Sequence, residues 1–177
     1  PIGSVLGSLS AVKNSDTTGS GAGGQLTWTY TVANSAVEYL AAGQAKIESF
    51  TVTLNDQHGG LITKQIDVTI TGSNDVPVVA TADVSGAVTE AIAAVGNLTD
   101  SGAIGFTDVD LTDIHSLSTV TPSAGALGGL TANVSSDTTG SGLGGVVSWN
   151  YSVAAAAVEY LAAGQTKVET FGFNVLD

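Results

Sequence analysis

The 177-residue chain contains no cysteine, no methionine and no arginine, and only three prolines. Without cysteine it has neither disulfide bonds nor thiolate metal ligands, which excludes a disulfide-stapled scaffold. Four lysines stand against sixteen acidic residues, and the net charge is −12. Because binding to nucleic acid requires cations that neutralise phosphates, this balance argues against a nucleic-acid partner, and an anionic membrane surface would repel the chain.

Long apolar runs are also missing. No stretch approaches the roughly 20 consecutive apolar residues that a membrane-spanning helix needs, so no membrane insertion is expected. Apolar residues nevertheless make up 43 % of the chain and are dispersed along it. That composition is typical of a sequence that folds around its own hydrophobic core.

The chain repeats itself. Residues 1–56 align without gaps to residues 122–177 at an offset of 121, and 31 of the 56 aligned pairs are identical. A period of this length falls in the size range of a whole domain, about 100–150 residues, and is far longer than a solenoid repeat of about 20–50 residues. We therefore interpret the chain as about one and a half periods of a tandem array of domains.

Strand patterns dominate both copies. Leu26, Trp28, Tyr30 and Val32 alternate with threonine, and residues 147–153 repeat the alternation in the second copy. Alternation with period two, rich in β-branched and aromatic residues, is typical of a strand with one buried face. The sequence therefore predicts an all-β fold in which Trp28 and Tyr30 lie on the inward face.

One short helical turn is expected between strands. Ser35 is placed to cap a turn that runs to Ala42, with Glu38 in the capping-box position and Gly43 at its end. We expect this turn to be a structural crossover without chemistry.

The segment 72–77 is the expected domain boundary, because it follows the strand pattern that ends at Ile70 and because Pro77 favours an extended residue before it. Residues 1–76 would then be the C-terminal part of one repeat, and residues 77–177 the N-terminal part of the next. Each part would leave sheet edges and core uncovered. Two alternatives stay open: one circularly permuted sandwich, and a strand exchange with another chain.

Several motifs together resemble the VCBS repeat. They are Tyr39-Leu40-Ala41-Ala42-Gly43-Gln44, the stretches 50–60 and 68–77, and the blocks 88–90 and 105–115. The Gly-x-Asn-Asp-x-Pro sequence that ends at Pro77 is the most specific of them. The small residues 154–157 depart from the family pattern, as do the truncated ends.

The resemblance implies an immunoglobulin-like or cadherin-like antiparallel β-sandwich, strung in tandem within very large secreted proteins of the bacterial cell surface. Many of those proteins are similar to RTX-type adhesins that support attachment and biofilm formation. Calcium at domain junctions is a common property of such arrays. The implied partners are neighbouring repeats of the same polypeptide, and the implied location is extracellular.

Acidic residues cluster directly after Phe106, at Asp108, Asp110 and Asp113. Alternate residues of an extended segment point the same way, so Asp108 and Asp110 can converge on one point. No lysine lies nearby in the sequence, and the carboxylates therefore repel each other unless a cation neutralises them. Ca²⁺ suits such a cluster because it takes about six to eight oxygen ligands in irregular geometry.

Glu90 and the linker pair Asn74 and Asp75 would complete this calcium site in the manner of cadherins, where a junction collects ligands from both neighbouring domains. The alternative interpretation is a solvated acidic loop that only keeps the protein soluble. Asp113 also has an alternative role, as a cap of the turn that precedes Ile114.

Other chemistry finds little support. The two histidines, His58 and His115, have no thiolate partner for zinc and are interpreted as polar turn residues, with Asp56 bonding the amides of the turn around His58. No nucleophile elbow joins a strand to a helix, and the acids gather in a loop instead of facing each other across a cleft. The sequence thus predicts a non-catalytic, calcium-stiffened spacer. The alternative is a carbohydrate- or host-protein-binding sandwich, which would need an exposed aromatic platform.

Overall fold

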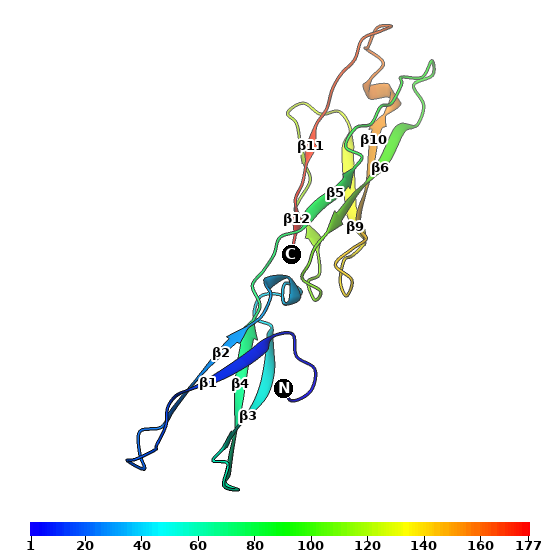
Figure 1. Cartoon of the computed structure of the whole chain (residues 1–177). Coiled ribbons are helices and arrows are strands. Elements are labelled where there is room, and N and C mark those ends of the chain that lie inside the picture. Colours follow the sequence, from blue (N-terminus) through cyan, green and yellow to red (C-terminus); the bar gives the residue numbers. More distant parts are fainter. The chain divides into compact units, whose positions relative to one another are not determined.

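The computed structural model describes all residues from Pro1 to Asp177, and the chain divides into two compact units, Pro1–Asn74 and Asp75–Asp177 (Figure 1). All strand pairs in both units are antiparallel. The helical elements are two short 3-10 turns. The predicted all-β, antiparallel fold is therefore confirmed. The structure contains no helix with the length and apolar character required to cross a lipid bilayer.

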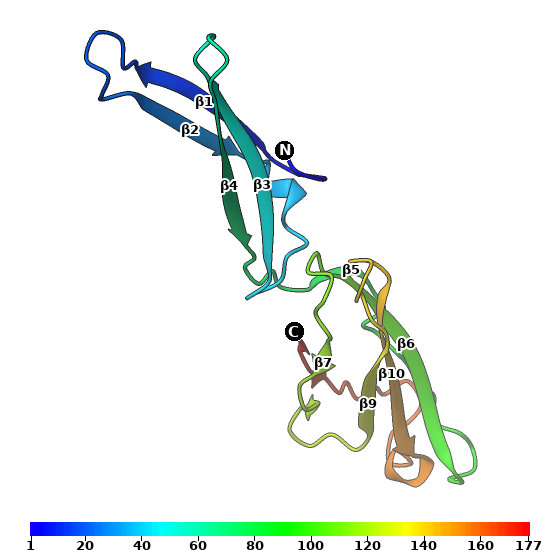
Figure 2. The same ribbon diagram turned by 90° about the horizontal axis from the view of Figure 1, so that it is seen from below.

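The first unit consists of two antiparallel strand pairs (Figure 2). Strand β1 (Ser8–Ser15) pairs with β2 (Gln25–Thr31), and β3 (Ala45–Asn55) pairs with β4 (Leu61–Thr71). The 3-10 turn η1 (Asn34–Ala36) connects the two pairs. Alternation of less exposed and exposed residues is clear in β3 and in the second half of β4, whereas β1 and β2 are almost entirely exposed.

The core of the first unit is small. Phe50 of β3 is buried and meets the ring of Tyr30 edge-on, with ring centroids 5.8 Å apart. Leu40 and Ala41, which follow η1, are buried as well. This short segment packs against the end of β4, where a Cβ atom added to Gly72 would lie 2.1 Å from the carbonyl oxygen of Leu40.

The second unit is built on a four-stranded sheet in the order β5-β6-β10-β9. Its strands are β5 (Val78–Ala82), β6 (Asn97–Thr107), β10 (Gly145–Ala154) and β9 (Gly129–Ser136). The 3-10 turn η2 (Ala155–Ala157) follows β10 directly.

Two short strand pairs form a second layer of this unit. Strand β8 (Thr121–Pro122) pairs with β11 (Phe171–Gly172), and β7 (Ser116–Leu117) pairs with β12 (Val175–Leu176). Phe171 of β11 packs against Tyr151 of the sheet, with ring centroids 5.7 Å apart. Aromatic burial therefore joins the two layers, as is usual for packed sheets.

Trp149 of β10 lies against the backbone of β6. It faces Gly102 across the strand pair, and a Cβ atom added to Gly102 would lie 2.5 Å from the indole Cζ2 atom. The indole N–H donates a hydrogen bond to the carbonyl of Asp83 over 2.7 Å, and the residue is only 7 % exposed. The prediction that the tryptophan lies on the inward face of its strand is therefore correct in the second copy.

The corresponding tryptophan of the first copy behaves differently. Trp28 of β2 is 45 % exposed, so its predicted burial is wrong. The reason is physical: β5 and β6, which cover Trp149 in the second unit, have no counterpart among the strands of the first. Tyr30, two residues further along β2, is half-buried.

The predicted helical turn is shorter than expected, and its cap is wrong. The 3-10 turn starts after Ala33, and no side chain caps it, so Ser35 does not have the capping role. The side-chain amide of Asn34 instead donates a hydrogen bond to Glu38. Gly43 has a φ of 79°, in the left-handed region that favours glycine, so the predicted end of the segment is correct.

Candidate functional site

The acidic segment begins where β6 ends. Asp108 and Asp110 are both fully buried, as is Phe106. The backbone N–H of Asp110 donates a hydrogen bond to Asp108 Oδ1 over 3.0 Å. The structure thus buries both side chains, as their alternation in the sequence predicts, and joins the Asp108 carboxylate to the backbone of Asp110.

Asp110 carries the least compensated charge of the site. Its Oδ2 atom accepts a hydrogen bond from the backbone N–H of Asp75 over 2.7 Å. Its Oδ1 atom has no hydrogen-bond partner, although the residue is 0 % exposed. A buried carboxylate oxygen without a partner is costly, and a bound cation is one of the arrangements that removes this cost.

Asp113 belongs to the same negative cluster. The chain turns between Asp110 and Asp113, whose N–H donates to the Asp110 carbonyl over 3.3 Å. Burial raises the pKa of the half-buried Asp113 carboxyl, and the carboxylates of Asp110, Asp108 and Asp177 raise it further. Protonation becomes easier because the neighbouring negative charges oppose ionisation.

His115 is not the polar turn residue that the sequence indicated. It is buried between two carboxylates: Nε2 lies 3.1 Å from Asp108 Oδ2, and Nδ1 lies 2.7 Å from Asp137 Oδ1. Its backbone N–H also donates to Asp137 Oδ2 over 3.0 Å. Burial alone would lower the pKa of the imidazole, but the two aspartates outweigh burial and raise it.

The imidazole therefore lies beside Asp108, in the place where the sequence predicted a metal ion. It contacts Asp108 and Asp137 but makes no hydrogen bond to the free oxygen of Asp110. The buried side-chain oxygen that remains without a hydrogen-bond partner is Asp110 Oδ1. Sequence reasoning missed Asp137, which is 22 residues away from His115 and belongs to the turn between β9 and β10.

Glu90 is not part of this cluster, and its predicted role as a ligand is corrected. It is exposed and lies between β5 and β6 in the sequence. The nearby backbone N–H of Ala87 donates to Asp100 Oδ2 over 2.7 Å. Asp100 precedes Asp108 by eight residues along β6, about 26 Å at the usual strand rise. Glu90 lies only three residues after Ala87, a span of about 11 Å at most, so it cannot reach the cluster.

The linker residues Asn74 and Asp75 were predicted to complete the calcium site at Asp108 and Asp110. Asp75 contacts Asp110 through its backbone N–H, and Asn74 is the last residue of the first unit. No group of three or more histidine, aspartate or glutamate side chains is arranged as a complete metal site. A calcium ion at Asp110 would therefore also draw oxygens from backbone carbonyls and water, which this ion accepts readily.

The turn around His58 has the structure that was predicted for it. Asp56 Oδ1 accepts hydrogen bonds from the backbone N–H groups of His58 and Gly60, each over 2.8 Å. These bonds lower the pKa of the Asp56 carboxyl. The aspartate therefore bonds turn amides, as expected.

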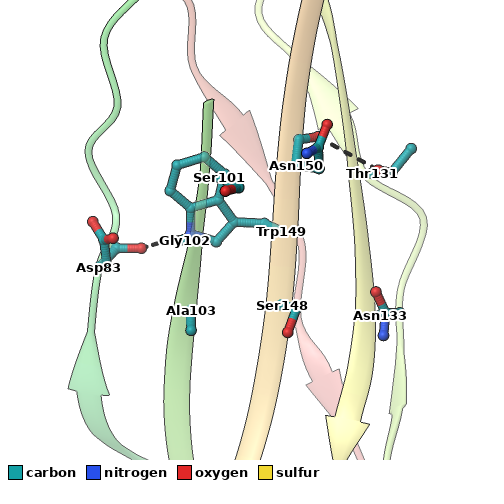
Figure 3. A pocket seen from close by; sticks show the side chains of 9 residues that line it. All are labelled: Asp83, Ser101, Gly102, Ala103, Thr131, Asn133, Ser148, Trp149 and Asn150. Carbon is teal, nitrogen blue, oxygen red and sulfur yellow. Dashed lines mark hydrogen bonds between the residues drawn. The ribbon is translucent and has the colours of Figure 1, made fainter. Parts of the chain in front are cut away.

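A shallow depression lies beside Trp149 on the four-stranded sheet (Figure 3). Small polar residues line it, and Thr131 Oγ1 donates to the Asn150 carbonyl over 3.4 Å. Trp149 presents little surface there, and its indole N–H is already bonded to Asp83. The depression therefore lacks the exposed aromatic platform that a carbohydrate-binding sandwich would need.

Comparison with known protein families finds no match for this sequence. Comparison with curated proteins finds none either. The resemblance to the VCBS repeat thus depends on the sequence motifs alone.

Proposed function

We propose that the chain is a non-catalytic structural spacer from a secreted bacterial adhesin, and that calcium bound at Asp110 stiffens the point where a repeat begins. The internal repeat supports an array of like domains. The order of the sheet and the short strand pairs that face it support an immunoglobulin-like or cadherin-like sandwich. The motif resemblance supports an extracellular location on the bacterial surface.

The single observation that carries the calcium proposal is the free Oδ1 atom of Asp110. It is a charged oxygen, fully buried and without a hydrogen-bond partner, in a cluster that already contains Asp108 and Asp113. The donors are hard carboxylate oxygens, which suit Ca²⁺ better than a softer metal. Asp110 and Asp113 would hold the ion, and its charge would replace carboxylate repulsion with attraction.

The same side chain connects the site to the start of the second unit. Asp110 Oδ2 accepts the backbone N–H of Asp75, the first residue of that unit. An ion held by the other oxygen would fix the carboxylate and, through it, the position of Asp75. Extracellular modules bind calcium with dissociation constants of about 10⁻⁴–10⁻³ M, so such a site is filled outside a cell and empty in the cytosol.

Calorimetric titration of the chelator-treated chain tests the proposal. We expect heat of binding and a higher melting temperature at millimolar calcium. The Asp110→Asn variant should lose both responses. It should also melt at or above the wild-type temperature in chelator, because the variant removes a buried, unpaired charge. The control is Asp67→Asn, which makes the same change of charge at an exposed strand position and should keep the calcium response. Absence of heat and of a melting shift in the wild-type chain would overturn the proposal.

A further inference from the structure

Strand β2 of the first unit has one free edge, whereas its copy in the second unit has none. Strand β10 is hydrogen-bonded on one side to β9 and on the other to β6. Strand β2 is bonded only to β1, the counterpart of β9. The backbone N–H and C=O groups that β10 directs to β6 are therefore without strand partners in β2.

The side chains at this edge show the same difference. Trp149 is seated on the backbone of two glycines: a Cβ at Gly102 would lie 2.5 Å from the indole, and one at Gly86 would lie 3.1 Å from it. Its indole N–H bonds to the carbonyl of Asp83. Trp28, its copy, lies 45 % exposed on an edge where no such seat is present.

The turn that follows β1 also differs from its copy in the second unit. Asp137 binds both the ring and the backbone N–H of His115. Its copy Asp16 is exposed and pairs over 2.5 Å with Lys13, a residue of its own strand pair. In the second unit Asp137 thus holds the segment that follows β6. In the first unit Asp16 lies exposed at the equivalent position.

We propose that the outer edge of β2, with the exposed side of Trp28, is a docking surface for a β5–β6 segment from another repeat of this kind. The segment would take the register that β6 has on β10. Because Trp149 faces Gly102 in that register, Trp28 would face the Gly102 of the incoming segment, and Thr31 would face its Thr99. This inference rests on the internal repeat and is independent of calcium.

The repeat also defines how the segment has to be joined. Residue 121 directly precedes residue 122, which is the counterpart of Pro1. A copy of residues 75–121 placed immediately before Pro1 would therefore reach β2 along the same path that the natural segment takes to β10, without an added linker.

The test compares the 177-residue chain with a fusion in which residues 75–121 precede Pro1, both in chelator. The added segment contains no tryptophan, so both proteins show two indole N–H signals by nuclear magnetic resonance, and the Trp28→Phe variant identifies that of Trp28. In the fusion we expect the Trp28 indole N–H to exchange with solvent at least about tenfold more slowly, because it becomes buried and hydrogen-bonded. The tryptophan fluorescence should shift to shorter wavelength.

The control is the same fusion with Gly102→Leu in the added copy only, which blocks the seat of the indole. It should leave Trp28 as exposed as in the original chain, while the Trp149 signal stays unchanged. If Trp28 remains unprotected in the unmodified fusion while Trp149 keeps its signal, the proposal is overturned. It is also overturned if Trp28 of the original chain is already protected in a concentration-dependent dimer in which Trp149 keeps its signal, because β6 of each copy would then remain on its own β10 and another surface of the second copy would cover the edge.

Discussion

The phenol of Tyr30 donates a hydrogen bond to the carboxylate of Glu48 over 2.9 Å. Glu48 is only 1 % exposed, and the same carboxylate accepts the backbone N–H groups of Leu6, over 2.5 Å, and Gly7, over 3.0 Å. Three donors thus compensate one buried negative charge. The arrangement fixes the segment before β1 to the middle of β3.

The second copy contains the same arrangement. Tyr151 donates to Glu169 over 3.0 Å, and the backbone N–H groups of Leu127 and Gly128 donate to that carboxylate over 2.7 and 3.1 Å. Every partner is displaced by the offset of 121 residues. We call each set of four residues a glutamate clamp.

The first prediction concerns the charge of the clamp. The Glu48→Gln variant should destabilise the first unit by about 2–3 kcal/mol, because an amide cannot accept all three donors as a carboxylate does. Urea unfolding followed by fluorescence of Trp28 measures the change. The control variant Glu90→Gln alters an exposed loop residue and should change stability by less than about 0.5 kcal/mol. Equal effects of the two variants would contradict a structural role for the clamp.

The second prediction concerns acid. Burial alone would raise the pKa of the Glu48 and Glu169 carboxyls, but the two amides and the phenol lower each of them below the ordinary value of 4.5. A lowered folded-state pKa stabilises the fold above pH 4.5, and this contribution is lost as the pH falls through the folded value. The melting temperature should therefore drop below about pH 4.5, and the drop should be smaller in the Glu48→Gln, Glu169→Gln double variant.

The third prediction concerns alkaline pH. Burial, together with the bond to glutamate, raises the pKa of Tyr30 and of Tyr151 from 10.0 to about 12. The protonated phenol is favoured in the fold, so the stabilisation is complete below pH 10 and is lost as the pH rises towards 12. Ultraviolet titration of tyrosinate should show a late component near pH 12. That component should shrink in the Tyr30→Phe and Tyr151→Phe variants, and its persistence in the double variant would exclude this assignment.

The fourth prediction uses two adjacent glycines. A Cβ at Gly128 would lie 2.4 Å from the hydroxyl of Tyr151, whereas a Cβ at Gly129 would meet no atom within 4 Å. Gly128→Ala should therefore cost about 1–3 kcal/mol and displace the tyrosine, because a packed site tolerates no added methyl group. Gly129→Ala should be neutral or slightly stabilising. Thermal unfolding of the two variants checks the difference, and similar melting temperatures would contradict the close packing of the clamp.

The fifth prediction separates the two histidines. His115→Leu should destabilise the second unit by about 3–5 kcal/mol, since it leaves the carboxylates of Asp108 and Asp137 without their buried partner. His58→Leu, at an exposed turn, should change stability by less than about 0.5 kcal/mol. Chemical denaturation of both variants measures the effects. A small loss for His115→Leu would show that the imidazole does not hold the aspartates.

The all-β fold could be predicted because its evidence is local. Alternation at residues 26–32 and 147–153 shows which side chains share a strand face without knowledge of any partner. The inward positions of Asp108 and Asp110 follow from the same rule. Each of these predictions required only neighbours in the sequence.

The remaining features depend on contacts between distant segments. Trp28 and Trp149 share the pattern Trp-x-Tyr-x-Val, yet only the second is covered, because coverage comes from strands elsewhere in the chain. The position of His115 depends on Asp137, and that of Glu90 on the length of β6. Local patterns contain no information on these distances.

Because the glutamate clamp occurs twice, each copy can serve as the reference for the other in the same sample. The clamp residues are identical in the two copies, yet β10 is paired on both sides and its counterpart β2 on one side only. A single isotope-labelled preparation therefore contains a matched pair of probes. The difference between the paired signals reports, within one spectrum and at one temperature, what the neighbouring strands add to the rigidity of a sandwich.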